Sequence, residues 1–375
     1  MTTQTAAKGP VNTIMAAGLT GLVVSLGLVM VGLLQEGHAA FNTGSNGITW
    51  GLPVVTYVFF VLTSTGLTFV ASLAMVFGFK DFYPIAKRCI WLAVVTLIAG
   101  FASLAMEIGH PFRMLWAIPL SFQYLSPLNW MGVFYAAYLG LLLLKFHKVN
   151  GGDWDSGTSR QLGIASFVAV VIAHGTLGGV FGSMAMRPMW YGGLVPIYFL
   201  LTAAVSGAAF AVLITYLTYG NEAAMPEKVR TLMQGAMPKV FAAVLAVVIL
   251  AVVSRTVTGL WSNADGLQVW DHIVASPWFW IELLLMVAAF FMLLTGSSPM
   301  WPAVMVIVSL FIGRYEFIIS GQLVPLFKGS WVPGLISYTP SLTEWMLVVM
   351  AFSIVFFGWA FGEKSLNLEA APKEQ

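Results

Sequence analysis

The sequence predicts an all-α, polytopic membrane protein with ten transmembrane helices, arranged as two four-helix bundles and two flanking helices. The 375-residue chain is 59% hydrophobic and 9% charged, with a mean hydropathy of +0.88, which excludes an ordinary soluble domain. Ten apolar runs are also long enough to cross a hydrocarbon core that is ~30 Å thick. We expect the helices near residues 13–34, 51–78, 86–108, 127–147, 161–184, 193–219, 237–260, 277–296, 299–320 and 342–361.

These helices divide the chain into four segments. We expect the N-terminal tail, the first helix and an outer loop in 1–50, the first bundle in 51–184, the second bundle in 185–320, and an outer loop, the tenth helix and a tail in 321–375. A spacing match between the second and sixth helices favours two parallel bundles. The match consists of Tyr57, Gly66 and Phe69 in the second helix and Tyr198, Gly207 and Phe210 in the sixth.

The basic residues predict the orientation, because Lys and Arg concentrate in short cytoplasmic connections. Most of the 17 Lys and Arg residues, among them Lys87, Arg88 and Lys145, fall in segments on the side of both termini. Four fall on the other side, namely Arg113, Arg187, Arg255 and Lys328. We therefore expect both termini to be cytoplasmic, and we interpret the first apolar run as a retained helix rather than a signal peptide.

The metal-ligating residues restrict the cofactors. Cys89 is the single cysteine, so the chain alone cannot build a disulfide framework or a four-thiolate zinc or iron–sulfur site. His174 is the one histidine deep within a predicted helix, since His38, His110, His147 and His272 lie at helix ends or in loops. No metal or haem site is therefore expected, and a net charge of +2 gives no reason to expect nucleic acid.

Polar side chains gather in the outer halves of the predicted helices. At 1.5 Å per residue, His174 lies ~15 Å and Tyr57 ~9 Å from the outer helix ends. Glu107 and His110 close the third helix, and His38 closes the first. The later helices contribute a second-bundle polar network of Arg255, Glu282, Arg314 and Glu316. Because an ionisable group at the bilayer centre costs roughly 2.5–3.5 kcal/mol, this shared position predicts a functional polar pocket.

Each of these residues also has a structural interpretation. His110 could cap the last carbonyls of a helix, and Arg113 could anchor the membrane interface. The second-bundle network could consist of ion pairs between helices. Tyr57 could be a core tyrosine bonded to a backbone carbonyl, whereas His174 stands among glycines that leave room for a flat ligand.

The inner halves of the helices offer few polar groups in the sequence beyond Ser25, Thr215, Tyr216 and Thr218. A proton path through them would lack the acid, histidine or lysine steps that it needs. We therefore expect protons to be exchanged with the outer phase only, which would make turnover by this subunit alone electroneutral.

Several motifs resemble those of the polysulfide reductase membrane-subunit (NrfD/PsrC) superfamily. They are WGLP at the start of the second helix, EIGHPFR after the third, AHGTLGGVFG before PMWYGGLVPIYF, and SGQLVPL followed by YTPSLTEW. With its ten helices, the chain is similar to the branch that includes the membrane subunits of the hydrogenase-2 type (HybB) and of the sulfite-reduction-associated complex (DsrP). Many relatives carry an Arg-Pro pair where this chain has His110-Pro111.

The resemblance implies a haem-free subunit of the bacterial inner membrane. It would exchange electrons between menaquinone or ubiquinone and an extracytoplasmic ferredoxin-like iron–sulfur subunit. A multihaem cytochrome c, a molybdopterin subunit or a hydrogenase subunit would complete the complex. Tyr57 and His174 would bind the two oxygens of the quinone head, with Arg113 and His38 beside them, and Glu107 or His110 would relay protons to the outer phase.

Two other function classes share some of these features. A secondary transporter or ion-translocating protein would also carry an intramembrane histidine, acids and a parallel repeat, but it would need polar groups from both sides. A di-haem cytochrome anchor would need paired histidines in the membrane.

We predict that the purified chain shows no haem Soret band and holds no metal, because it lacks paired mid-membrane histidines and a cysteine cluster. Absorption spectroscopy and metal analysis of the purified protein test this prediction. A stoichiometric haem signal would contradict the quinone interpretation.

Overall fold

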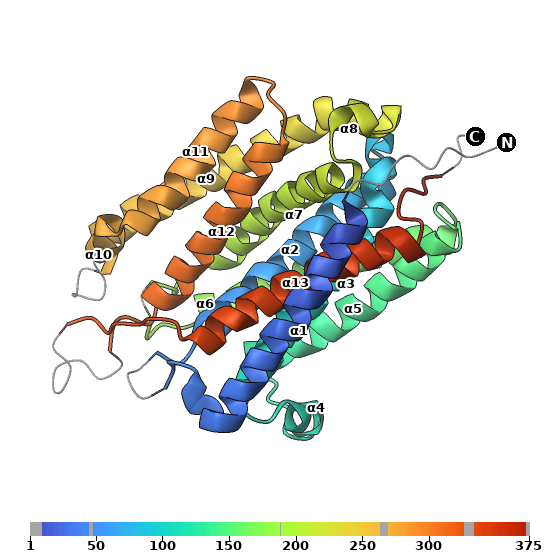
Figure 1. Ribbon diagram of the computed structural model, residues 1–375. Helices are drawn as coiled ribbons and strands as arrows, with labels where there is room; N and C mark the ends of the chain where they lie inside the picture. Colours follow the sequence, from blue (N-terminus) through green and yellow to red (C-terminus); the bar gives the residue numbers. More distant parts are fainter. Residues whose placement is uncertain (1–9, 45–47, 188, 263–268, 326–333, 373–375) are drawn as a thin grey trace.

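The computed structural model describes residues 10–44, 48–187, 189–262, 269–325 and 334–372, and the regular secondary structure in these ranges is helical (Figure 1). Ten of the described helices are long and apolar enough to cross a membrane. They contain α1 (Val11–Glu36), α2 (Leu52–Met75), α3 (Tyr83–Glu107), α5 (Pro127–Asn150), α6 (Gly157–Gly182), α7 (Val195–Tyr219), α9 (Ala236–Ser262), α11 (Pro277–Leu294), α12 (Met300–Ser320) and α13 (Leu342–Ser365). The predicted all-α fold is confirmed, and the protein is a multi-pass membrane protein.

Short helices connect the spanning helices. They are α4 (Pro111–Leu120), α8 (Glu227–Gln234) and α10 (Val269–Ala275), with 3-10 turns η1 (Gly37–Ala40), η2 (Lys80–Phe82) and η3 (Glu222–Ala224). We call the end at which α1 begins and α13 ends the inner end of the molecule, and the opposite end the outer end (Figure 1). At the outer end, α2, α5, α7 and α11 each begin with a proline in the first two positions, where a missing N–H breaks no helical hydrogen bond.

The contacts between helices form two closed rings of four. In the first ring α2 contacts α3, α3 contacts α5, α5 contacts α6, and α6 contacts α2. In the second ring α7, α9, α11 and α12 contact one another in the same way. Helices α1 and α13 pack together, and α13 also packs on α2 and α3 (Figure 1). We propose that the rings are the two predicted bundles, with chain boundaries near 184/185 and 320/321.

Helices α2 and α7 cross with their backbones in direct contact at Gly66 and Gly207. A Cβ atom added to Gly66 would collide with the carbonyl oxygen of Ala203, and one added to Gly207 would collide with the backbone of Gly66. Near the crossing, Thr63 Oγ1 and Ser206 Oγ lie 2.6 Å apart. Only glycine lets two helices approach this closely. These two glycines are also the ones that the spacing match pairs, so the contact joins equivalent points of the two rings.

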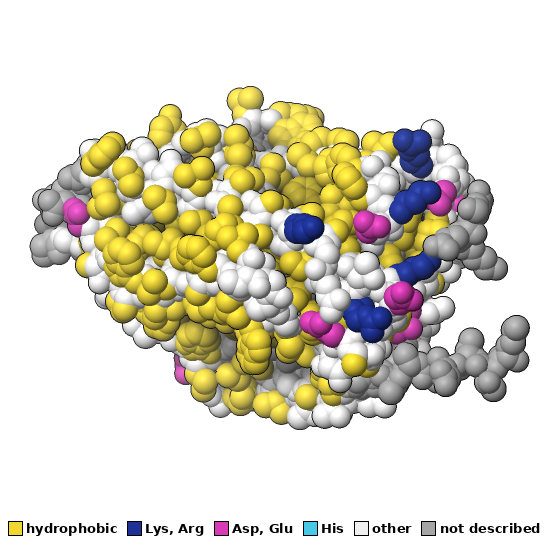
Figure 2. Space-filling view, turned by 90° about the horizontal axis from the view of Figure 1, so that it is seen from above, with side chains coloured by type: hydrophobic (Ala, Val, Ile, Leu, Met, Phe, Trp, Pro, Cys, Tyr) yellow, Lys and Arg dark blue, Asp and Glu magenta, His cyan; other side chains and the backbone are white. Residues whose placement is uncertain are grey.

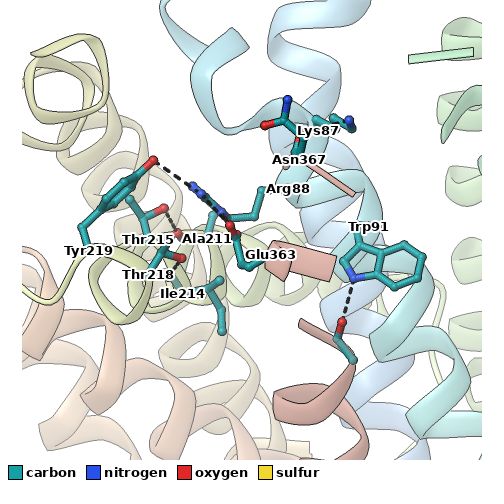
Figure 3. A network of polar contacts seen from close by, with 11 residues as sticks. Lys87, Arg88, Trp91, Ala211, Ile214, Thr215, Thr218, Tyr219, Glu363 and Asn367 are labelled. Atoms are coloured by element: carbon teal, nitrogen blue, oxygen red, sulfur yellow. Dashed lines mark hydrogen bonds and ion pairs between the residues drawn. The ribbon is translucent and has the colours of Figure 1, made fainter. Parts of the chain in front are cut away.

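A buried ion pair links three helices near the inner end (Figure 3). Arg88 of α3 pairs with Glu363 of α13, and both side chains are at most 1% exposed. Arg88 Nη2 also lies 3.5 Å from the hydroxyl of Tyr219 at the end of α7. Removing one partner of such a pair leaves an uncompensated buried charge, which costs roughly 3–5 kcal/mol. The ion pair therefore ties α13 to helices of both rings.

This end of the molecule corrects two expectations from the sequence. Lys87, Arg88 and Lys145 lie within spanning helices, as the predicted ranges place them, but their side chains are buried rather than solvated. Lys145 Nζ donates to Ser159 Oγ at 2.7 Å, and Lys87 Nζ donates to the Leu366 carbonyl at 2.7 Å. A charged side chain near a helix end can point into the protein where such hydrogen-bond acceptors are present. The position of the residue in the sequence does not show whether this happens. The expectation that the inner helix halves lack charged groups is wrong, so electroneutral turnover no longer follows.

Charged side chains gather toward the inner end on the face that Figure 2 shows. This face carries α8, α9 and α11, and most of it is covered by hydrophobic side chains, as a surface in contact with lipid should be. Lys328, which was assigned to the outer side, lies outside the described residues. We propose that the inner end faces the cytoplasm, as the excess of Lys and Arg predicts.

Replacing Gly66 with alanine should destabilise the protein, because the new Cβ would force α2 away from α7. Overpacking of this kind costs typically ~1–3 kcal/mol. Gly175→Ala is a matched control, since nothing lies within 4 Å of a Cβ added there. Thermal unfolding in detergent should give a lower Tm for Gly66→Ala than for the wild type or the control. Equal Tm values for all three proteins would contradict the backbone contact.

Candidate functional site

Three polar side chains from α2, α5 and α6 meet in the outer half of the first ring. The hydroxyl of Tyr135 lies 3.0 Å from His174 Nε2, and the two rings pack edge to face. The hydroxyl of Tyr57 interacts with that of Tyr135 and lies 4.0 Å from Met131 Sδ. None of Tyr57, Tyr135 and His174 is more than 3% exposed. The structure thus brings Tyr57 and His174 into one buried cluster, with Tyr135 between them.

The hydrogen-bond partners of His174 indicate which of its two ring nitrogens carries the proton. Nδ1 lies 3.2 Å from the carbonyl oxygen of Val170, which can only accept, so Nδ1 carries the proton. Nε2 then accepts from the Tyr135 hydroxyl, and the Tyr135 oxygen remains able to accept from Tyr57. The other partner of the Tyr57 hydroxyl is a thioether, which is a weak acceptor. The cluster can therefore pass a proton along three groups and offer the Tyr57 hydroxyl to a ligand.

A second hydroxyl cluster lies one helical turn further along α5. The Tyr138 hydroxyl lies 2.9 Å from Ser64 Oγ and 2.7 Å from Thr68 Oγ1. Ser64 Oγ also donates to the Ala93 carbonyl at 2.7 Å. The ring centroid of Tyr138 lies 6.4 Å from that of His174. The hydroxyl of Tyr138 is thus hydrogen-bonded to side chains of α2, whereas the hydroxyl of Tyr135 is hydrogen-bonded to His174.

Glu107 ends α3 at the outer end and faces the start of α2. Its carboxyl group interacts with the Gly51 backbone and lies in the field of Glu344. Glu107 Oε2 is buried and has no hydrogen-bond partner among the described residues. Glu344, in contrast, accepts from the Tyr338 hydroxyl at 2.5 Å and from the Ser341 amide at 2.7 Å. Burial and the Glu344 carboxylate raise the pKa of Tyr338, so that hydroxyl remains a donor. Of these two acids, Glu107 is the one with an oxygen free to exchange a proton.

His38, His110 and Arg113 lie at the surface of the outer end. His110 directly precedes α4, and His38 Nε2 lies next to Gly109, so both histidines flank the same turn. The Arg113 guanidinium lies 6.0 Å from the centroid of the exposed Trp116 ring, as an interfacial anchor would. Within the described ranges, no hydrogen bond or ring contact joins any of these three residues to the buried cluster.

The second-bundle network occupies the outer half of the second ring. Arg255, Glu282 and Glu316 help to line a cavity of about 30 Å³, which has room for at least one water molecule. The carboxyl groups of Glu282 and Glu316 interact with each other, and the Arg255 guanidinium lies 4.6 Å from the centroid of the Phe317 ring. The ion pairs within 4.0 Å among the described residues do not include these groups or Arg314. Cation–π contacts therefore take the place of the ion pairs that the sequence interpretation offered.

The motifs from distant parts of the chain converge on one seam between the two rings at the outer end. Trp50 stacks on Trp190 with ring centroids 5.3 Å apart. The amide side chain of Gln322 accepts from the Trp50 backbone N–H at 2.9 Å and donates to the Trp50 carbonyl at 2.8 Å. The Leu52 amide donates to the Tyr338 hydroxyl at 2.8 Å. Trp50, Trp190, Gln322 and Tyr338, one from each of four of these motifs, thus fix the start of α2, which carries Tyr57.

Tyr135 is the residue that the sequence analysis missed. It lies eight residues after Pro127, where α5 begins, and His174 lies eight residues before Gly182, where α6 ends. At 1.5 Å per residue, both side chains are ~12 Å from the outer helix ends. In two antiparallel helices that are neighbours, residues at equal distance from the outer end lie side by side. Counting residues could therefore have predicted that Tyr135 and His174 are at the same depth.

Residues 41–326 match the family described as polysulphide reductase, NrfD. The chain is 25% identical over 369 residues to a selenate reductase subunit of Mesobacillus selenatarsenatis, a match that covers 82% of this chain and 84% of that protein. It is 24% identical over 360 residues to the Hdr-like menaquinol oxidoreductase integral membrane subunit of Archaeoglobus fulgidus, with 87% of each chain covered. It is also 24% identical to the putative dimethyl sulfoxide reductase membrane subunit of Halobacterium salinarum over 215 residues, which cover 51% of this chain and 49% of that one. The resemblance of the motifs is confirmed, and the chain belongs to the NrfD polysulphide reductase family.

Proposed function

We propose that this chain is the quinone-reactive membrane subunit of a respiratory reductase complex. The observation that carries the proposal is the buried cluster of Tyr57, Tyr135 and His174, which lies among spanning helices near the outer end. Membership of the NrfD family supports it, as does the similarity to a relative that is named a menaquinol oxidoreductase subunit. The same family membership favours a redox role over the alternative of a secondary transporter.

The residues of the cluster fit a quinone head. Such a head is planar and apolar and has two carbonyl oxygens that accept hydrogen bonds. Tyr57 offers a hydroxyl whose partner besides Tyr135 is a weak acceptor. The Phe101 ring lies 5.5 Å from the Tyr57 ring and 5.3 Å from the Tyr135 ring, measured between centroids, so it provides an apolar wall for both. The head would take the place of the contact between the two tyrosines.

The side chains then have distinct roles. A bound menaquinone or ubiquinone supplies the exchange of two electrons and two protons. Tyr57 orients the head by donating a hydrogen bond to one oxygen, and Tyr135 donates to the other. His174 is neutral at rest and becomes a cation when its Nε2 takes up a proton as Tyr135 turns away, while the Nδ1–H stays bonded to the Val170 carbonyl. Glu107 moves protons between this cluster and the outer phase through its unpaired Oε2.

The remaining candidates take outer positions in this proposal. His38 and His110 flank the turn next to Glu107. In this proposal they exchange protons with the outer phase. Arg113 anchors the interface beside Trp116 rather than contacting the quinone. The second-bundle network of Arg255, Glu282, Arg314 and Glu316 keeps a structural role in the second ring.

The outer end offers a surface for a redox partner. Large hydrophobic side chains beyond the ends of the spanning helices are strongly exposed, among them Tyr124, Leu125, Met186 and Tyr191. Exposed apolar groups of this kind mark protein interfaces. We place an extracytoplasmic ferredoxin-like iron–sulfur subunit there, with a molybdopterin, hydrogenase or multihaem cytochrome c subunit as the further member of the complex, in the bacterial inner membrane.

Tyr135→Phe should weaken quinone-linked electron transfer, because it removes the hydroxyl between Tyr57 and His174. The loss of a neutral hydrogen bond is worth ~0.5–1.5 kcal/mol, and the His174 Nε2 left unpaired adds to that cost. Turnover of the complex measured against quinone concentration should show about a tenfold lower kcat/KM. Tyr138→Phe is the matched control, since it removes a hydroxyl one turn away on the same helix. A similar loss in both variants would point to packing rather than to a quinone contact.

His174→Leu should abolish quinone-linked electron flow while the subunit still assembles, because leucine keeps the helix apolar but cannot accept a proton. Tyr57→Phe should reduce the rate less, since it removes one neutral hydrogen bond. Assembly is followed by co-purification of the partner subunits. Normal turnover and unchanged quinone affinity in His174→Leu would remove His174 from the site.

A further inference from the structure

A large groove opens at the inner end of the second ring, far from the candidate quinone site. Its volume is about 760 Å³, and it lies between the inner halves of α9 and α11, next to α8 and the hairpin that joins α11 to α12. Its walls are the alanines of α9 and the large side chains of α11, namely Ala242, Ala243, Ala246, Phe290, Leu293 and Leu294. Ala243 and Leu294 are exposed, so the groove is open to the surrounding lipid.

The alanine side chains of α9 are too small to fill the space beside the large side chains of α11. In a membrane, helices gain little from burying apolar surface against each other, because lipid chains are equally apolar. An apolar groove at this depth is therefore suited to an acyl chain. The face that carries α9 and α11 is otherwise covered by hydrophobic side chains, with charged ones gathered toward the inner end (Figure 2).

The rim of the groove carries one cation and one carboxylate. Lys239 is exposed and makes no hydrogen bond or ion pair with another residue in the described part of the chain. Glu222 accepts from the Tyr216 hydroxyl at 2.5 Å and from Gln234 Nε2 at 2.8 Å. These donors lower the pKa of Glu222, so the carboxylate keeps its charge at mildly acidic pH. Both charged groups line the same groove.

We propose that this groove is a binding site for one molecule of phosphatidylethanolamine from the inner leaflet. The lipid phosphate lies against Lys239, the primary ammonium donates to the Glu222 carboxylate, and one acyl chain runs along Ala242 and Ala246 toward Phe290. The lipid then joins α9 to α11 in the second ring, so its binding stabilises the folded subunit.

The chemistry of the rim separates this lipid from other occupants. An anionic lipid such as phosphatidylglycerol has a phosphate for Lys239 but no cation for Glu222. Phosphatidylcholine carries a quaternary ammonium, which has no N–H to donate to the carboxylate. A quinone has no charge for either group. The opposite charges of the rim therefore select a zwitterionic head group that has hydrogen-bond donors.

The test uses the full chain, delipidated in detergent and returned to phosphatidylethanolamine, phosphatidylcholine or phosphatidylglycerol. Native mass spectrometry should show one bound phosphatidylethanolamine, held about tenfold more tightly than the other two lipids, a ratio that corresponds to about 1.4 kcal/mol. The Tm should rise with phosphatidylethanolamine more than with either of them. Lys239→Met should weaken its binding about tenfold, whereas Lys364→Met, an exposed lysine at the same end that does not line the groove, should leave it unchanged.

Two further variants distinguish the contribution of the lipid head group from that of the acyl chain. Glu222→Gln should abolish the preference for phosphatidylethanolamine over phosphatidylcholine while phosphate binding persists. Ala243→Phe should fill the groove at an exposed position and displace the lipid without a change of charge. The proposal is overturned if phosphatidylglycerol binds wild type as tightly as phosphatidylethanolamine, if a quinone occupies the groove, or if Lys239→Met and Ala243→Phe both keep the lipid.

Discussion

The backbone contact between Gly66 and Gly207 is the constraint on which the arrangement of the other helices depends. Because no side chain separates α2 from α7 at this point, the two rings share a wall, and α2 becomes buried on nearly all sides. The outer ends of α2 and α7 are thereby held together. The stacked rings of Trp50 and Trp190 and the hydrogen bonds of Gln322 follow from this proximity, and they fix the position at which α2 begins.

The same crossing relates the polar groups of the two rings. Tyr57 and Tyr198 hold equivalent positions in the spacing match, and each belongs to a polar cluster that includes a residue from the last helix of its ring. Tyr57 belongs to the cluster with His174, whereas the ring of Tyr198 lies 5.5 Å from the Arg314 guanidinium. At these positions the first ring therefore presents uncharged donors and acceptors, which suit a neutral quinone, whereas the second presents acids that contact each other and cations that lie over aromatic rings. Equivalent backbones have acquired different chemistry through their side chains.

The sequence predicted the ten helices because each apolar run has to be long enough to cross the hydrocarbon core of the membrane. It also predicted that Tyr57 and His174 both lie in the outer halves of their helices, since depth is a matter of counting residues. The depth of Tyr135 could be counted in the same way, but the sequence did not show that its side chain faces His174, because a tyrosine in an apolar helix carries no sign of the face that it occupies. The buried pair of Arg88 and Glu363 was equally hidden. Those residues are 275 positions apart, and only the packing of α13 on α3 brings them together.

The most direct test of the account is to locate the quinone. A photoreactive quinone analogue is added to the assembled complex, irradiated with and without excess natural quinone, and the labelled peptides are identified by mass spectrometry. The account predicts label on α2, α5 and α6 near Tyr57, Tyr135 and His174, and natural quinone should suppress it. Suppressible label confined to α7 and α12, near Tyr198 and Arg314, would contradict it and move the site to the second ring.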